Sequence, residues 1–410
     1  MLFRSTLSFM RVVEDGLVRL TDNVSRYIPG FKPWESVPEK KGERVERQSI
    51  TITNLLNHTS GLPSYVGVPG FLARYEQYGD PLKMNLRDSL TAYLTDGLER
   101  LNRPGEVMRY SCLNFITLQT IIERTTGMRL DHFAKQEVFD KLRLKNTWYN
   151  CIADAERPFS ADAKIVPTEV QPDGKVLYGE VHDPLARVVN GGVSGNAGVF
   201  STAEDLAVIA SLMLNDGVIR LPADGIKGFF GGTDRIRLYS KNTVDAFTRI
   251  PAGYEEHGRA LGWDIGVAHG SYMGELLTPG SLVNHSGYTG TSMAICLYCH
   301  RALLGRYAIK IGWLIQDDDG DFWNSAPPFG NGKRRCLCVF FAWGNKSKNS
   351  QCARRLCGGN YGCRLGLELA HPCHRASRCA GGMVVFAGDP WNAFGDWLAA
   401  MDGYSASECV

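Results

Sequence analysis

The chain has 410 residues, of which 44% are hydrophobic and 21% charged, and its formal net charge is +2. This composition is typical of a globular protein with one large domain or two ordinary ones, and it excludes an intrinsically disordered chain. The small net charge gives no reason to expect nucleic acid as a partner. No run of about 18 apolar residues and no secretory signal is evident, so we expect a cytoplasmic protein without a membrane partner.

The predicted elements begin with an amphipathic helix from the N-terminus to Glu14, which Gly16 can end. Further helices are expected over residues 54–57, 71–99, 113–126, 131–139 and 202–214. Gly127 ends the helix over 113–126, and Thr202 caps the helix over 202–214. Strands are expected over residues 261–266 and 291–297, and the segment 191–198 is a glycine-rich connection.

The texture of the sequence changes near residue 298. Ten of the 12 cysteines lie between Cys296 and Cys409, among arginine, glycine and tryptophan without a helical or strand period. We therefore expect a domain over residues 1–297 and a separate, partly disordered tail over 298–410. The cysteine spacings in the tail lack the paired C-x2-C of zinc sites, so we expect no metal and no other cofactor. A metal-binding tail on an inert scaffold is a third hypothesis, behind the two given below.

Four segments occur in an order that indicates a family. They are Val12 to Asp22, Ile52 to Leu62 with its His-Thr-Ser-Gly-Leu run, Pro104-Gly105 followed by Tyr110-Ser111, and His285-Ser286-Gly287-Tyr288-Thr289-Gly290. Together they resemble the serine β-lactamase-like hydrolases, which include class C β-lactamases and penicillin-binding-protein relatives such as esterases and transesterases. The resemblance covers about residues 5–297. It implies an α/β (α+β) fold of the β-lactamase/transpeptidase type, with an antiparallel sheet flanked by helices and a mostly helical subdomain.

The resemblance also implies roles for five residues. Tyr110 matches the tyrosine that shares the work of a general base with a lysine, and nearby positive charge would have to lower its pKa. The backbone N–H of Tyr288 would form half of an oxyanion hole. His285, Ser286 and Gly287 would form the strand along which the substrate lies. Histidine in place of a lysine at 285 favours an esterase, transesterase or peptidase over an antibiotic hydrolase.

The neighbours of Tyr110 complete the candidate site. Ser111, Cys112 and Asn114 follow it, with Cys112 where relatives carry Asn or Asp. We interpret Cys112 as a packed thiol, because no His–acid pair adjoins it. His58 is interpreted as a structural residue of its loop. The alternative for Tyr110 is a structural role, as a buried tyrosine whose hydroxyl makes a hydrogen bond.

The nucleophile of the family is missing, because no serine in the sequence is followed three residues later by lysine. Ser5 and Ser8 lie on the first predicted helix, and the N–H of a mid-helix serine is bonded within the helix. We expect the Ser-x-x-Lys to precede Met1. Two hypotheses follow. The first is a serine hydrolase, esterase or acyltransferase that uses an acyl-enzyme on a small ester or amide and is inactive as written. The second is a pseudoenzyme or binding scaffold; the oligomeric state stays open.

Overall fold

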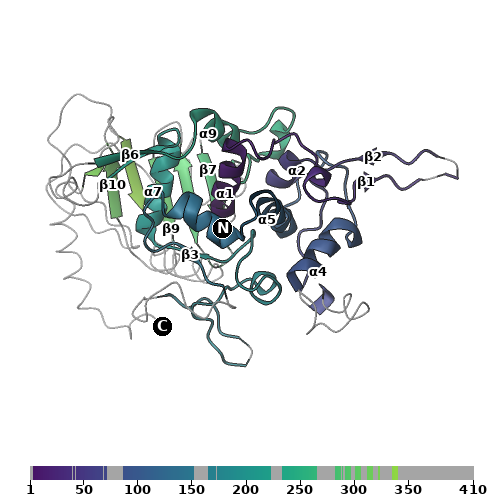
Figure 1. Cartoon of the computed structure of the whole chain (residues 1–410), viewed down its shortest axis with the longest axis horizontal. Helices are drawn as coiled ribbons and strands as arrows, with labels where there is room; N and C mark the ends of the chain where they lie inside the picture. Colours follow the sequence, from purple (N-terminus) through teal and green to yellow (C-terminus); the bar gives the residue numbers. More distant parts are fainter. Residues whose placement is uncertain are drawn as a thin grey trace, which may run out of the picture.

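The computed structural model describes residues 3–38, 40–41, 43–67, 69–71, 86–151, 165–171, 173–222, 233–265, 282–287, 289, 291–296, 301–305, 312–316, 322–323 and 335–339. A sheet lies on one side, with α7 (Ala203–Leu214) against it, and the helices α2 (Ile52–Leu56), α4 (Leu86–Ala92) and α5 (Cys112–Thr126) lie on the other side (Figure 1). Helix α1 (Phe3–Glu14) lies between them and contacts both α5 and α9 (Lys241–Thr248). Two parts therefore meet along α1.

The helices form where local signals and apolar faces agree. Ser111 caps α5 by accepting a hydrogen bond from the N–H of Leu113, and Gly127 ends it with a φ of 68°. Thr202 caps α7 by accepting from the N–H of Asp205. The remaining helical elements are α6 (Leu130–Ala134), the π-turns η2 (Tyr93–Gly97), η3 (Lys135–Phe139) and η4 (Leu185–Val189), and the 3-10 turns η1 (Val24–Arg26) and η5 (Glu255–His257). No helix in the described ranges is long and apolar enough to cross a membrane.

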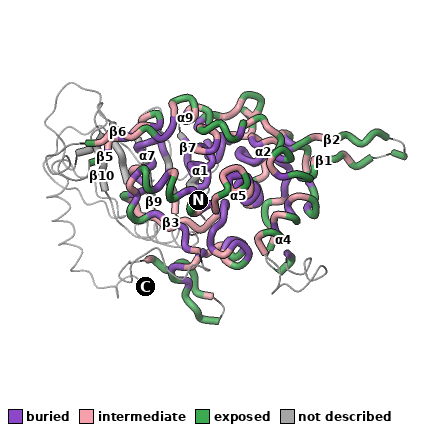
Figure 2. The backbone as a smooth tube through the Cα atoms, viewed as in Figure 1, coloured by how far each residue is buried: buried purple, intermediate pink, exposed green. Residues whose placement is uncertain are grey.

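Helix α1 runs through the hydrophobic core. Leu7, Met10 and Val12 on this helix have no solvent exposure and belong to the hydrophobic core, in which α1 contacts α5 and α9. Figure 2 shows the buried backbone concentrated at α1 and α5, while the hairpin of β1 (Trp34–Glu35) and β2 (Arg47–Gln48) extends outward and is largely exposed. The helix is therefore a structural centre, as its predicted amphipathic pattern requires.

The main sheet has six strands in the order β11-β10-β12-β9-β8-β7. Its strands are β7 (Leu282–Ser286), β8 (Ser292–Cys296), β9 (Arg301–Gly305), β10 (Gly312–Gln316), β11 (Phe322–Trp323) and β12 (Arg335–Val339). All neighbours pair antiparallel except β12 and β9, which are parallel. Two-stranded sheets are formed by β1 with β2, by β3 (Trp148–Tyr149) with β4 (Val199–Phe200), and by β5 (Val218–Pro222) with β6 (Thr233–Arg237). The expected fold class is confirmed.

Some sequence predictions need correction or remain open. Residues 261–265 do not form a strand, because Gly262 adopts a φ of 84° and the Ala260 N–H bonds the Trp263 carbonyl in a tight turn. The helix predicted over 131–139 is α6 followed by η3, and the segment 71–99 is helical over Leu86–Gly97, with 72–85 outside the described residues. Strands β9 to β12 come from the predicted tail; most of the rest of the tail, with its cysteine cluster, lies outside the described residues, so its separation as a domain stays a prediction.

Candidate active site

Tyr110 and Ser111 lie at the N-terminal end of α5, where backbone hydrogen bonds hold them. The Arg109 N–H bonds the carbonyl of His58 at 2.8 Å, and the Cys112 N–H bonds the carbonyl of Ser64 at 2.9 Å. The hydroxyl of Ser111 donates to a carbonyl at residue 63 over 2.6 Å, and its side chain caps α5. Ser111 is therefore a cap and an anchor, and its hydroxyl does not face the site.

The ring of His58 packs against the ring of Tyr110. Its hydrogen bonds and its burial keep it in the neutral form. Its Nδ1 accepts two hydrogen bonds at 3.1 Å, from the Ser111 N–H and from Asn114 Nδ2. A ring nitrogen that accepts carries no proton, so the neutral ring holds its proton on Nε2. Burial, with added repulsion from Arg259 and His285, holds the pKa of His58 well below its ordinary value. His58 is thus a neutral structural histidine, with a left-handed φ of 62°.

Asn114 belongs to this support and does not line the site. It is fully buried, and its Oδ1 accepts from the hydroxyl of Ser60 at 2.6 Å while its Nδ2 donates to His58. The Ser60 Oγ in turn accepts from the N–H of Leu62. These bonds fix the His-Thr-Ser-Gly-Leu loop against α5. Tyr110 precedes the Ser111 cap and is not part of the helix, so helical spacing does not place Asn114 on the same side as Tyr110.

The ring of Tyr110 lies at the meeting point of several elements. Its centroid is 4.5 Å from that of His58 and 6.4 Å from that of His285, and the guanidinium carbon of Arg259 lies 5.4 Å from it. The residue is 37% exposed to solvent, so one side of it is open. Burial of the other side raises the pKa of Tyr110 above its ordinary value; Cys112 and Asp183 add to the rise, and Arg259 opposes it. Tyr110 is therefore a neutral phenol at neutral pH.

Strand β7 forms the opposite wall and lies at the edge of the sheet. The His285 side chain is buried, and its Nδ1 lies 2.8 Å from the Ser286 carbonyl, so Nδ1 is the donor. Ser286 is exposed, and the Gly287 N–H bonds the Thr291 carbonyl at 2.6 Å. Tyr288 lies outside the described residues, so its role in an oxyanion hole stays a prediction.

The free edge of β7 is capped only at one point among the described residues. Asn284 exchanges two backbone hydrogen bonds of 2.9 Å with Asp264. Backbone groups of alternate residues in a strand face the same edge, so those of Ser286 face the edge on which Asp264 lies. This edge, next to Tyr110, offers main-chain donors and acceptors to an extended ligand.

Asp183 lies close enough to Cys112 and Tyr65 to act on the ionisation of both. Burial raises the pKa of Cys112 to about 11, Asp183 adds to the rise, and a hydrogen bond with Asn196 opposes it. Burial and Asp183 likewise raise the pKa of Tyr65 to about 12. Cys112 is thus a thiol at neutral pH, which agrees with its interpretation as a packed residue. The neighbouring His182 lies 3.2 Å from the carboxylate of Glu169.

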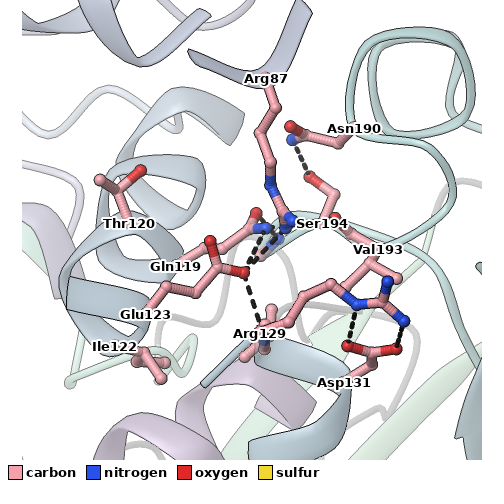
Figure 3. A network of polar contacts seen from close by, with 12 residues as sticks. Arg87, Gln119, Thr120, Ile122, Glu123, Arg129, Asp131, Asn190, Val193 and Ser194 are labelled. Atoms are coloured by element: carbon pink, nitrogen blue, oxygen red, sulfur yellow. Dashed lines mark hydrogen bonds and ion pairs between the residues drawn. The ribbon is translucent and has the colours of Figure 1, made fainter. Parts of the chain in front are cut away.

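A polar network fixes the glycine-rich connection beside the site. Figure 3 shows the network, in which Arg87 and Gln119 both donate to the carbonyl of Val193 and to the carboxylate of Glu123. The Arg87–Glu123 ion pair measures 2.8 Å, and Gln119 Oε1 accepts from the N–H of Gly195 at 2.9 Å. A Cβ at Gly195 would lie 1.9 Å from the carbonyl oxygen of residue 115, so only glycine fits there. The network thereby seats the 193–196 segment against α5.

The two serines of α1 are engaged in the interior. The hydroxyl of Ser5 donates to the carbonyl of Gly195 at 2.6 Å and lies 3.2 Å from the hydroxyl of Tyr149. Ser8 has no solvent exposure. Both lie in the first turns of α1, and both are buried.

The structure brings together Tyr110 and His285, from motifs about 175 residues apart in the chain, and it places Cys112 beside them. Sequence reasoning missed Arg259, which stands in no motif that a single sequence reveals, and it interpreted Asp183 as structural. No group of three or more potential metal ligands occurs within the part of the chain that the structure describes. A cavity of about 310 Å³ lies elsewhere, lined by residues of α9 and by Leu20, Thr53 and Leu261.

Comparison with known proteins gives the family. The family described as Beta-lactamase matches residues 2–297. An "N-acetylmuramyl-L-alanine amidase" of Bacillus subtilis is 32% identical over 308 residues, which cover 71% of this chain and 62% of the relative. A "Putative D-alanyl-D-alanine carboxypeptidase" of Salmonella typhi is 28% identical over 318 residues, covering 74% of this chain and 66% of that protein. The chain thus spans less than two thirds of the length of these relatives.

Among solved structures, the octameric penicillin-binding protein homologue from Pyrococcus abyssi aligns with 20% identity and a TM-score of 0.47, over 72% of this chain and 57% of that one. EstCE1, a hydrolase with promiscuous acyltransferase activity, aligns with 19% identity and a TM-score of 0.46, over 72% of this chain and 74% of that one. The family match over residues 2–297 shows that this chain belongs to the Beta-lactamase family.

Proposed function

We propose that the site formed by Tyr110 and β7 serves acyl transfer by a serine hydrolase of the amidase, peptidase or esterase type. The observation that carries the proposal is the approach of Tyr110 to His285, 6.4 Å between ring centroids, beside an open sheet edge. Membership of the Beta-lactamase family supports it. The expected reaction splits one difficult displacement into formation and hydrolysis of an acyl-enzyme.

The open edge of β7 would bind the substrate as an additional strand. The main-chain groups of Ser286 face this edge, and they can bond an extended acyl chain regardless of its side chains. Tyr110 would then lie beside the scissile bond. As a neutral phenol it can give a proton to the leaving group; acting as a base requires additional positive charge near its oxygen.

The substrate class that we propose is an amide or ester of a small acylated compound, with peptidoglycan-type peptides tested first. Two relatives are named for such bonds, an N-acetylmuramyl-L-alanine amidase and a D-alanyl-D-alanine carboxypeptidase. An extended peptide also suits a sheet edge better than a compact ligand does.

A second function is favoured by one specific observation, the lack of any Ser-x-x-Lys in the 410 residues. Ser5 is bonded to Gly195 and Ser8 is sealed in the core, so neither replaces the nucleophile. A chain without a nucleophile would use the site formed by Tyr110 and β7 for binding alone. We therefore propose that the 410-residue chain does not turn over a substrate by itself.

The test compares two proteins. One is the 410-residue chain, and the other carries one additional helical turn with Ser-x-x-Lys ahead of Phe3, in register with α1. Hydrolysis of D-alanyl-D-alanine peptides, muramyl-L-alanine amides and p-nitrophenyl esters is measured for both. We expect turnover only in the extended protein. The contrary result is an extended protein that folds with an unchanged circular dichroism spectrum, binds the peptides and yet hydrolyses none of the three substrates. That result would favour the binding scaffold as the function.

A further inference from the structure

A buried arginine lies behind the proposed catalytic tyrosine, and no motif points to it. Arg259 is 4% exposed and begins a turn that closes at Asp264 through an isolated antiparallel bridge. The turn is held on two further sides. The Gly262 N–H bonds the carbonyl of Leu56 in α2 at 2.9 Å, and Asp264 exchanges backbone bonds with Asn284 of β7. The guanidinium therefore sits on a rigid part of the fold.

The charge of Arg259 is only partly compensated. Its Nη2 lies 3.5 Å from a carboxylate oxygen of Asp264, which is long for a hydrogen-bonded ion pair. In the described part of the chain its Nε and Nη1 are shielded from solvent and have no hydrogen-bond acceptor. Arginine stays protonated in proteins, so a positive charge is retained here at a cost in desolvation. Negative charge that develops next to such an incompletely paired buried cation is stabilised by it.

The group next to it is the ring of Tyr110. The Arg259 Cζ lies 5.4 Å from the ring centroid, within the range of a cation–π contact. The π-system of a phenolate is more negative than that of a phenol, so the contact strengthens when Tyr110 loses its proton. Because Nε and Nη1 are shielded from solvent, they cannot contact a ligand that binds beside Tyr110 in this geometry. Arg259 is therefore not a substrate-binding residue.

We propose that Arg259 is the positioning residue of Tyr110: its guanidinium holds the ring in place and favours the phenolate that general-base catalysis needs. The inference rests on the proposed function, because it assigns Tyr110 a proton-transfer role. Asp264 adjusts the effect by neutralising part of the charge. In the family resemblance a lysine shares the work of the base with this tyrosine; in this chain Arg259 places a positive charge next to the tyrosine ring.

Other charged and titratable groups also face Tyr110, and the test has to separate Arg259 from them. They are His58 of the loop after α2, Cys112 of α5, Asp183 ahead of η4 and His285 of β7, while Asp264 pairs with Arg259 itself. His58 is neutral, and Cys112 and Asp183 oppose the phenolate. Arg259 is thus the cation whose removal has to shift the titration toward the neutral phenol.

The experiment places 3,5-difluorotyrosine, a more acidic phenol than tyrosine, at position 110 and follows its ionisation by ¹⁹F NMR. A unit charge at this distance changes a proton equilibrium more than tenfold at an effective dielectric constant of about 20. Arg259→Met, which removes the charge and keeps the chain length, is expected to raise the proton affinity of residue 110 at least about tenfold. Arg259→Lys is expected to recover part of that change, and Asp264→Asn to lower the proton affinity. Arg249→Met removes an exposed charge and serves as the matched control, with an unchanged titration.

A titration of Arg259→Met that coincides with that of Arg249→Met overturns the proposal. If Arg259→Met does not fold, Asp264→Asn decides: a lower proton affinity supports the proposal, and an unchanged one refutes it. The titration requires no nucleophile and no turnover, so it can fail while the acyl-transfer function holds, and it can succeed in a chain that hydrolyses nothing.

Discussion

Substitution of Gly262 by alanine is expected to loosen the turn that carries Arg259. Gly262 has a φ of 84°, and a Cβ there would lie 2.1 Å from Thr6 Oγ1 and 2.7 Å from Thr6 Cγ2 in α1. The left-handed backbone costs an L-residue about 1–2 kcal/mol, and overpacking a filled interior costs about 1–3 kcal/mol more. Gly262→Ala should therefore lower the free energy of unfolding by about 2–5 kcal/mol, a large fraction of the stability of an ordinary domain.

The two costs can be separated with a matched control. Gly253 has the same φ of 84°, but a Cβ there would meet nothing within 4 Å. Gly253→Ala should thus cost only the backbone strain of about 1–2 kcal/mol. In a Thr6→Ala background the side-chain clash is largely removed, so Gly262→Ala should become less costly by about 1–2 kcal/mol. Urea unfolding followed by circular dichroism measures the unsubstituted chain, the three single variants and the Thr6→Ala/Gly262→Ala double variant. The reasoning fails if Gly262→Ala costs no more than Gly253→Ala, or if the cycle with Thr6→Ala is additive.

Three further predictions concern the residues around Tyr110. Asn114→Ala should lower the free energy of unfolding by about 2–3 kcal/mol in urea titrations, because it leaves the buried Ser60 hydroxyl without its acceptor; a cost under about 0.5 kcal/mol would contradict this. His58 should keep its neutral Nε2–H form from pH 8 to pH 5.5 in ¹⁵N–¹H NMR. Because its folded pKa is depressed, its contribution to stability should be lost as pH falls below about 6.5 toward that folded pKa, and a His58 that titrates near 6.5 would refute the burial argument. Cys112, with its pKa raised to about 11, should react with iodoacetamide at pH 8 more than tenfold slower than free cysteine, as judged by mass mapping; equal rates would contradict its packing.

Local signals in the sequence predicted the helices well. The helix ends depend on one or two residues each, namely Ser111 and Gly127 for α5 and Thr202 for α7. Such local signals can be read from the sequence without knowledge of tertiary contacts. The motif order also led to the family, and with it to Tyr110 on one wall and His285 on the other. These are the parts of the site that carry a pattern.

The rest depends on contacts that no local pattern contains. Residues 261–265 look apolar and strand-like, yet the close approach of Gly262 to Thr6 forces a left-handed turn. Asn114 follows Tyr110 closely in sequence, but the turn of α5 directs its side chain to His58. Arg259 lies some 150 residues after Tyr110 in the chain, and only the folded chain brings the two together.

Most directly, the assignment of Tyr110 and β7 to one acyl-transfer site is tested by the intact mass of the chain extended with Ser-x-x-Lys, after brief incubation with p-nitrophenyl acetate at neutral pH. The site described here predicts a single acetyl group on the introduced serine, formed much more slowly when Tyr110 is replaced by phenylalanine. A folded protein that gains no acetyl group, or one that gains it equally fast with Tyr110→Phe, would contradict the assignment.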